Sequence, residues 1–459
     1  MKLLEYPNAD RIILLLIMSI AIGMIWGVKG YIYGFLLLVP FTLPSFNVSK
    51  IPVFGYYLLS LSLKERSITF AGLVTLLFLT KLDRFSYLKK SLIFLTIVNI
   101  LAILVAVEFG VLTGPEYYSG WYPKVFLYPS MLFIIVFRYA NDIKTIKRML
   151  VFLLIGNVVF VLLTQIFTSA ELGYLSSRSG LRYGGFWNLP MGIKAYADTV
   201  ILSGYLAITV ILSVGFIFMT KSYAVRIPLL ISIILSLKLM FFTFSRTGLY
   251  GTIVGTIIIL SLNIFKMGQN KALPKKLIKL IVFIALIAIL FVVGFKHMIF
   301  SIEGTEREDY VFRLLSPTSS GSNIYGRWDL FSQSIENSLS HPLGEGIDLI
   351  KQQTGANHHS TVTKYLSALG WFGMACFSFF ISICIKCVWK ATKSENLEIR
   401  KMAIIVFTCL IAFILMSFGI GILGPMWGIA YFWSLLALGV SLGYLDANTI
   451  RNRSESIST

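Results

Sequence analysis

The stretch "MAIIVFTCLIAFILMSFG" (402–419) carries no charged side chain and is long enough to cross the hydrocarbon core of a bilayer, about 30 Å thick, as one helix. Similar apolar runs recur along most of the 459 residues, of which 57% are hydrophobic and only 13% are charged. We therefore expect an all-α fold: a polytopic integral membrane protein, forming one membrane domain overall.

The runs set the expected number of transmembrane helices. Two of them, 51–63 and 67–80, are short for a hydrocarbon core, so we expect twelve to fourteen spans. The runs fall near 12–28, 31–45, 51–63, 67–80, 91–109, 124–138, 149–168, 199–219, 227–244, 247–265, 280–298, 361–385, 402–419 and 422–445.

Basic residues predict the orientation. The formal net charge is +19, but the lysines and arginines are spread over short connections rather than gathered on one soluble face, which favours contact with membrane lipids and not with nucleic acid. Four clusters are separated by even numbers of runs, so they share a side, which the positive-inside rule makes cytoplasmic, together with both termini. The clusters are Lys81, Arg84, Lys89 and Lys90; Arg138, Lys144, Lys147 and Arg148; Lys266, Lys271, Lys275, Lys276 and Lys279; and Lys386, Lys390, Lys393, Arg400 and Lys401.

One connection on the opposite side is unusually long. Residues 299–360 carry eight acids against four bases, the reverse of the basic clusters, and a loop of this length usually carries function. It divides the chain into N-terminal transmembrane helices (1–298), a long loop (299–360), and C-terminal transmembrane helices with a cytoplasmic tail (361–459).

The four cysteines lie within or at the ends of the predicted spans. Cys384 and Cys387 have the spacing of a metal or redox pair, but no second pair accompanies them, so we interpret them as packing residues. We expect no metal, because no ligand cluster faces the outer side, and no cofactor.

Two of the four histidines stand where the long loop re-enters the membrane, in "NHHSTVTKYLSALGWFG" (357–373). We expect His359 in the first turn of a helix, with Gly370 on the same helix face eleven residues later. The positive end of the helix dipole would keep His359 neutral and available as a base. Gly370 and Gly373, one turn apart, would let a neighbouring helix approach closely. The simpler interpretation is that His359 caps the helix or anchors it at the interface.

Several motifs resemble those of one bacterial family. His359-Ser360, nine residues, Gly370 and Gly373 match the pattern H-[NSQ]-x9-G-x-x-[GTY], which is similar to a motif of O-antigen ligases and the related Wzy-type O-antigen polymerases. Three further stretches resemble the family in the expected order: "LRYGGFWNLPMG" (181–192), "FTFSRTGLYG" (242–251) and "GRWDLFSQSIENSLSHPLGEG" (326–346).

The resemblance implies a GT-C-like membrane glycosyltransferase in the inner membrane, with its site on the periplasmic side. Its substrates would be oligosaccharides linked to undecaprenyl diphosphate, and a chain-length regulator protein would be a partner. His359 would be the catalytic base, while Arg246, Arg327 and Arg182 would bind the diphosphate, since guanidinium groups bind phosphate oxygens in pairs. Each arginine has a plainer interpretation as an interfacial or solvated charge.

Two activities of this family and one transport function are the alternatives. A polymerase would transfer glycan to another lipid-linked repeat unit in lipopolysaccharide biosynthesis, and a ligase would transfer polymer to lipid A core. We favour the polymerase because the Arg-x-x-x-Leu element of some ligases is not reproduced at Arg327. A lipid-linked oligosaccharide flippase would instead show short outer loops and a repeat between its halves, and neither is found here.

Overall fold

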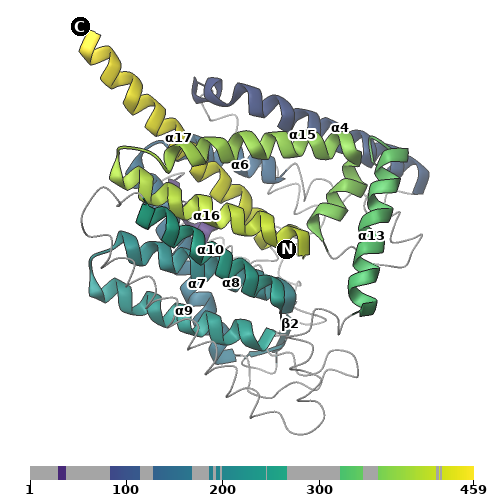
Figure 1. Ribbon diagram of the computed structural model, residues 1–459, viewed down its shortest axis with the longest axis horizontal. Helices are drawn as coiled ribbons and strands as arrows, with labels where there is room; N and C mark the ends of the chain where they lie inside the picture. Colours follow the sequence, from purple (N-terminus) through teal and green to yellow (C-terminus); the bar gives the residue numbers. More distant parts are fainter. Residues whose placement is uncertain are drawn as a thin grey trace, which may run out of the picture.

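A computed structural model describes residues 29–30, 32–37, 83–113, 128–167, 186–189, 193–196, 199–243, 245–265, 321–344, 360–419, 423 and 426–458. The described chain is helical apart from one short hairpin, and most of its long helices run in roughly the same direction (Figure 1). Six of the described helices are long and apolar enough to cross a membrane: α7, α8, α9, α15, α16 and α17. The expected all-α, polytopic membrane architecture is therefore confirmed.

Four of the predicted runs lie outside the described residues: 12–28, 51–63, 67–80 and 280–298. On each of the other runs from residue 91 onward, the structure has a helix. The elements are η3 (Asp83–Leu88), α4 (Lys89–Thr113), α6 (Tyr128–Tyr139), α7 (Ile143–Phe167), β1 (Phe186–Leu189), β2 (Ile193–Tyr196), α8 (Thr199–Met219), α9 (Tyr223–Thr243), α10 (Arg246–Phe265), α13 (Gly321–Ser340), α15 (Thr361–Ala391), α16 (Leu397–Gly419) and α17 (Met426–Ser458). Helix α13 lies within the long loop predicted at 299–360.

Three of the predicted basic clusters meet at one end of the bundle, which we call the basic end. Lys147 in α7 forms an ion pair of 3.1 Å with Glu398 at the start of α16, so the α6–α7 and α15–α16 turns are neighbours. Tyr87, just before α4, packs against Tyr444 of α17 with ring centroids 5.4 Å apart. The cluster at 266–279 lies outside the described residues. The described residues of the other three clusters lie at one end of the bundle, and which side of a membrane this end faces stays a prediction.

The turn between α6 and α7 is held by an N-cap. The carboxylate of Asp142 accepts the backbone N–H of Thr145 at 2.7 Å and the Thr145 hydroxyl at 2.6 Å, and it pairs with the Lys29 ammonium at 3.3 Å. Burial alone would raise the pKa of Asp142, but these hydrogen bonds and the nearby ammonium outweigh it, and the pKa lies below its ordinary value. The stability contributed by this carboxylate is therefore lost as the pH falls through the lowered pKa.

Lys29 also lies at the basic end, because its ammonium donates to Asn141 at 2.9 Å. The runs 12–28, 51–63 and 67–80 lie outside the described residues. The number of spans and the side of the N-terminus therefore stay predictions.

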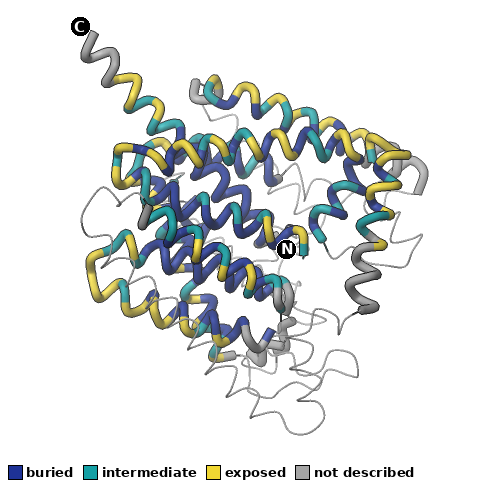
Figure 2. Tube along the Cα trace, in the orientation of Figure 1, coloured by how far each residue is buried: buried dark blue, intermediate teal, exposed yellow. Residues whose placement is uncertain are grey.

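The core is centred on α17. Trp433 is fully buried and contacts Phe380 of α15 and Phe133 of α6, with ring centroids 5.6 and 6.2 Å away. Dark, buried residues fill the middle helices in Figure 2, while exposed residues follow the outer sides of α4 and α9. Because lipid tails are as apolar as these side chains, the hydrophobic effect does not drive the helices together within the membrane. Close packing of side chains holds the bundle instead.

A buried polar contact adds to this packing. The side-chain oxygen of Asn157 in α7 accepts hydrogen bonds from the hydroxyl of Tyr205 in α8, at 2.7 Å, and from that of Tyr431 in α17. Hydrogen bonds between membrane helices are each worth about 0.6–2 kcal/mol. One asparagine therefore ties three helices together.

Helix α15 is broken at Gly370, which corrects the expectation of one continuous face from His359 to Gly370. The backbone there has φ 63° and ψ −178°, a conformation almost confined to glycine. The segment before the break leaves the axis of the longer segment behind it, as Figure 1 shows at the end of α15 that meets α13. The two positions therefore do not belong to one regular helical face.

The break exists because another backbone fills it. The Phe372 N–H donates to the carbonyl of Pro342 at 3.3 Å. A Cβ on Gly370 would lie 2.2 Å from that carbonyl oxygen, and a Cβ on Gly344, where φ is 93°, would lie 2.3 Å from the Ala368 oxygen. The loop after α13 and the kink of α15 are thus in direct backbone contact.

We predict that Gly370→Ala lowers the free energy of unfolding by about 2 kcal/mol or more, because alanine is strained at this φ and meets immovable backbone. Gly255→Ala is the matched control: its Cβ would meet side-chain atoms and not backbone, namely Cδ1 and Cγ1 of Ile211 and the Cβ of Ala412, and alanine favours the helix by about 1 kcal/mol. Thermal melting in detergent compares the two. Equal melting temperatures would contradict the backbone contact.

Candidate functional site

The end of the bundle opposite the basic end, which we call the site end, is where α8, α10 and α15 begin and α16 ends. Ser360 is the N-cap of α15: its hydroxyl accepts the Val362 N–H at 3.2 Å and donates to the Ser417 carbonyl at 3.0 Å. The second bond satisfies one of the carbonyls that the last turn of α16 leaves without a helical partner. The start of α15 is thereby fixed to the end of α16.

This cap corrects the expected position of His359. The helix begins at Thr361, so His359 stands one residue before the N-cap and not in the first turn. His359 and His358 themselves lie outside the described residues. The serine of the His359-Ser360 motif has a clear structural role, because serine is a favoured N-cap residue.

The "SRTG" motif (245–248) forms the beginning of α10 at the same end. Arg246 is the first residue of that helix, and its side chain lies outside the described part of the chain. A Cβ on Gly419 would lie 3.6 Å from the Cβ of Thr247, so the residue after Arg246 abuts the end of α16. A Cβ on Gly248 would lie 2.6 Å from the carbonyl oxygen of Ser203, so the motif glycine permits close contact with α8.

The last turn of α16 therefore joins two motifs that are more than 100 residues apart in the sequence. Ser417 contacts the residue after His359, and Gly419 contacts the residue after Arg246. The sequence of the run 402–419 does not predict that its last turn belongs to a site. The feature that could have indicated it is the pair of small residues, Ser417 and Gly419, at the end of the run.

The upstream motif (181–192) also leads to this end. Arg182 lies outside the described residues, but the Asn188 stretch forms strand β1, which pairs antiparallel with β2 from Phe186 opposite Tyr196 to Leu189 opposite Ile193. Helix α8 begins three residues after β2, and its first turns pack on α10 at Gly248. The hairpin is therefore anchored at the site end.

The fourth motif (326–346) reaches the site end through α13. Arg327 is in the first half of this helix, where its side chain lies outside the described residues; by register position 327 shares a face with Ser334 and Ser338, which are buried. The Pro342–Gly344 part of the motif makes the backbone contact with Gly370 described above. Two motifs that resemble the same family thus meet directly.

Gly373 lies beside α4. A Cβ at this position would be 3.5 Å from a methyl of Leu101, an ordinary van der Waals contact, so α4 does not require a glycine there. Nearly two helix turns further along, Phe379 of α15 stacks on Phe94 of α4 with centroids 5.6 Å apart. The expected close approach at Gly370, in contrast, involves the Pro342–Gly344 turn and not a helix.

The connection between α16 and α17 completes the described part of the site end. The Leu423 N–H donates to the Thr361 hydroxyl at 3.2 Å, and the Tyr365 hydroxyl donates to the Leu423 carbonyl at 3.3 Å. No motif in the sequence marks these residues. They fix the first turn of α15, and so the point at which His359 joins it.

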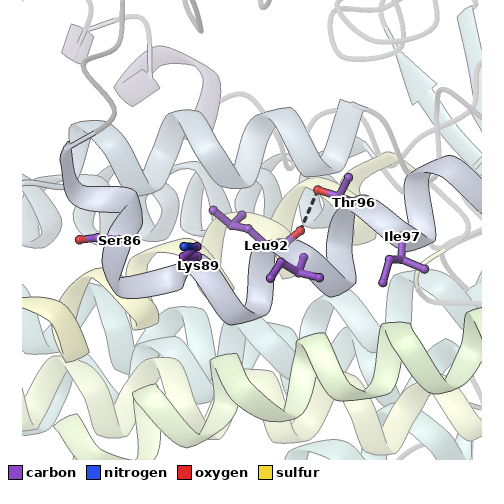
Figure 3. A pocket seen from close by; sticks show the side chains of 6 residues that line it. Ser86, Lys89, Leu92, Thr96 and Ile97 are labelled. Carbon is purple, nitrogen blue, oxygen red and sulfur yellow. Dashed lines mark hydrogen bonds between the residues drawn. The ribbon is translucent and has the colours of Figure 1, made fainter.

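A surface hollow lies far from this end. It is lined by Ser86 of η3 and by residues of α4, Lys89, Leu92, Ile93, Thr96 and Ile97 (Figure 3). The lining comes from one continuous stretch of chain at the basic end, and the Thr96 hydroxyl is bonded to the Leu92 carbonyl of the same helix at 2.8 Å. It brings together none of the predicted site residues.

Comparison with known proteins adds no relative, since neither the family models nor the curated proteins compared with the chain match it.

We predict that cysteines at Thr247 and Gly419 form a disulfide, because a Cβ–Cβ distance of 3.6 Å lies within the range that disulfides require. Alkylation of the remaining thiols followed by intact mass measurement should show two fewer reactive thiols after mild oxidation than before it. The two single-cysteine variants are the controls. If the disulfide does not form, the beginning of α10, where Arg246 stands, does not lie against the end of α16.

Proposed function

We propose that the chain is an O-antigen polymerase, a membrane glycosyltransferase that extends a surface polysaccharide in the inner membrane. It would transfer glycan from a polyprenyl-diphosphate carrier to the acceptor sugar of another lipid-linked repeat unit, with inversion and without a metal. The observation that carries the proposal is the convergence on the last turn of α16, where Ser417 holds the residue after His359 and Gly419 abuts the residue after Arg246. This convergence supports the proposal because a catalytic base and a phosphate-binding arginine that act on one substrate must lie close together.

The proposed reaction is a single displacement. An acceptor hydroxyl oxygen bonds to the anomeric carbon of the donor sugar, the bond from that carbon to the diphosphate oxygen breaks, and the electron pair leaves on the diphosphate. The hydroxyl proton passes to His359, which stands next to the N-cap of α15.

Charge stabilisation falls to the arginines. Arg246, Arg327 and Arg182 belong to the chain segments that reach the site end, and their guanidinium groups would hold the leaving diphosphate through paired hydrogen bonds. Arginine keeps its charge at an interface where lysine can lose it. The periplasmic side of the membrane would then correspond to the site end and the cytoplasm to the basic end.

The acceptor decides between polymerase and ligase, and a strain that lacks the gene tests it directly. Lipopolysaccharide from this strain should run on a gel as core capped by a single repeat unit, because ligation still proceeds without polymerisation. Bare core, with polymer accumulating on the carrier lipid, would establish the ligase instead. An unchanged ladder would rule out both.

We predict that His359→Ala fails to restore the ladder in this strain, whereas His358→Ala restores it. General-base catalysis is worth roughly 10² to 10⁴ in rate, and the motif assigns it to one histidine of the pair. Both variants are compared at equal membrane protein levels and equal melting temperatures. A ladder from His359→Ala would remove the base from the mechanism, and loss in His358→Ala alone would shift the motif by one residue.

We predict that Arg246→Lys loses most of the activity although it keeps the charge, since an ammonium cannot reproduce the two parallel bonds of a guanidinium. Arg226→Lys is the matched control: this arginine lies at the basic end, where its guanidinium donates two bonds to the Thr220 carbonyl, at 3.0 and 2.7 Å. Ladder length and intensity in the complemented strain measure both. Equal, near-normal ladders would make Arg246 an interfacial anchor.

A further inference from the structure

Five large apolar side chains are exposed around the break in α15, and we call them the kink patch: Ile335, Leu339, Leu343, Trp371 and Phe372. Leu339 is 67% exposed, Leu343 51% and Trp371 48%. The hydrogen bond from the Phe372 N–H to Pro342 joins the two halves of the patch, and the rings of Trp371 and Phe372 pack edge to face. The patch is therefore built from adjoining segments: α13, the turn after it, and the kink of α15.

Helix α13 has three different faces. Ser334 and Ser338 are buried on the face towards α15, while Ile335 and Leu339, one turn apart, stand on an exposed apolar face. By register this apolar face continues to positions 328 and 324, which are tryptophan and isoleucine in the sequence. Gln333 and Glu336 are exposed on the third, polar face. This pattern is typical of a helix that lies in a membrane interface.

The patch continues the exposed apolar surface of the neighbouring membrane helices. Leu101 of α4 lies against Gly373, and Ile100 and Leu104 beside it are 50% and 55% exposed, as is Phe379 of α15, at 58%. Since α15 is long and apolar enough to span a bilayer, we expect its exposed apolar side chains to face lipid. Along α15, the exposed Trp371 and Phe372 of the kink patch are followed by the partly exposed Met374 and Ala375 and then by Phe379.

The direction of α13 agrees with this position. It runs across the direction of α4 and α15 at their far end, as a helix parallel to the membrane surface does (Figures 1 and 2). Trp371 is of the residue type that concentrates at the level of the lipid headgroups. The exposed acids Asp329 and Glu336 make α13 unsuited to attracting anionic headgroups. Apolar contact would hold it there.

We propose that α13 is an interfacial helix of the leaflet at the site end, with the kink patch immersed among lipid acyl chains and Gln333 and Glu336 facing water. Helix α13, the described helix of the long loop, is thus seated in the membrane surface rather than standing free of it. This fixes the depth of the Pro342–Gly344 turn and of the Gly370 break that it fills. The proposal does not depend on the chemistry proposed above.

Spin-label accessibility tests it. Single cysteines at Leu339 and Leu343, and at Gln333 and Glu336 as matched controls, are labelled with a nitroxide in a chain whose four native cysteines are replaced by alanine and whose melting is unchanged. In nanodiscs of phosphatidylcholine, labels at 339 and 343 should collide with oxygen severalfold more, relative to a water-soluble nickel chelate, than labels at 333 and 336. Equal ratios at all four positions would place the patch in water and overturn the proposal.

A second copy or another protein segment could cover the patch instead, and labels at 339 and 343 shielded from both reagents would show it and overturn the lipid assignment. The unsubstituted chain provides an independent measurement. Reconstituted with a lipid that carries a photoactivatable diazirine on its acyl chain, it should be labelled within 335–343 and at 371–372. Peptides from these segments that stay unlabelled while those around Ile100 and Phe379 are labelled would equally refute the proposal.

Discussion

The hydrogen bond from the Phe372 N–H to the Pro342 carbonyl is the contact on which the arrangement of the site end depends. In a membrane every backbone group needs a partner, so a helix can break there only if other protein atoms satisfy the groups that the break releases. The turn after α13 supplies one carbonyl, and it approaches closely enough because Gly344 and Gly370 have no side chains. Breaking this contact would free the first segment of α15 from the angle it now holds.

That first segment carries the polar contacts of the site end. Ser360 begins it and bonds to Ser417, Thr361 accepts from Leu423, and Tyr365 donates to Leu423. Each contact joins α15 to α16 or to the connection that follows it. The kink therefore directs the residues next to His359 onto the end of α16, where the start of α10 also lies. A straight α15 would point its first turns elsewhere.

The described contacts at the site end are made mostly by backbone and small side chains, while the bulky aromatic residues gather around Trp433 in the core. Glycines at 248 and 419 and serines at 360 and 417 bring helices together closely, in the manner of membrane proteins generally. Such close contacts hold loop ends in fixed positions. The arginines and the histidine proposed for chemistry would stand on segments tied down in this way.

Much of this protein could be predicted from its sequence because apolar length and charge act locally. The run 402–419 predicts α16 without reference to any partner, and the basic clusters predict a shared end because each follows from counting crossings. The short runs 51–63 and 67–80 lie outside the described residues, so the exact number of spans stays a prediction. The helix break was not predictable in the same way. In the sequence, Gly370 looks like an ordinary small residue of a helix, and only its contact with Pro342, 28 positions earlier, explains the break. Likewise, Ser417 is only the end of an apolar run in the sequence, and its hydrogen bond with Ser360 appears only in the structure. The sequence by itself determined which segments enter the membrane, since that depends on transfer of each segment into lipid. Only the tertiary structure decided which loop ends meet, because backbone contacts between distant segments depend on shape and leave no periodic signal in the chain.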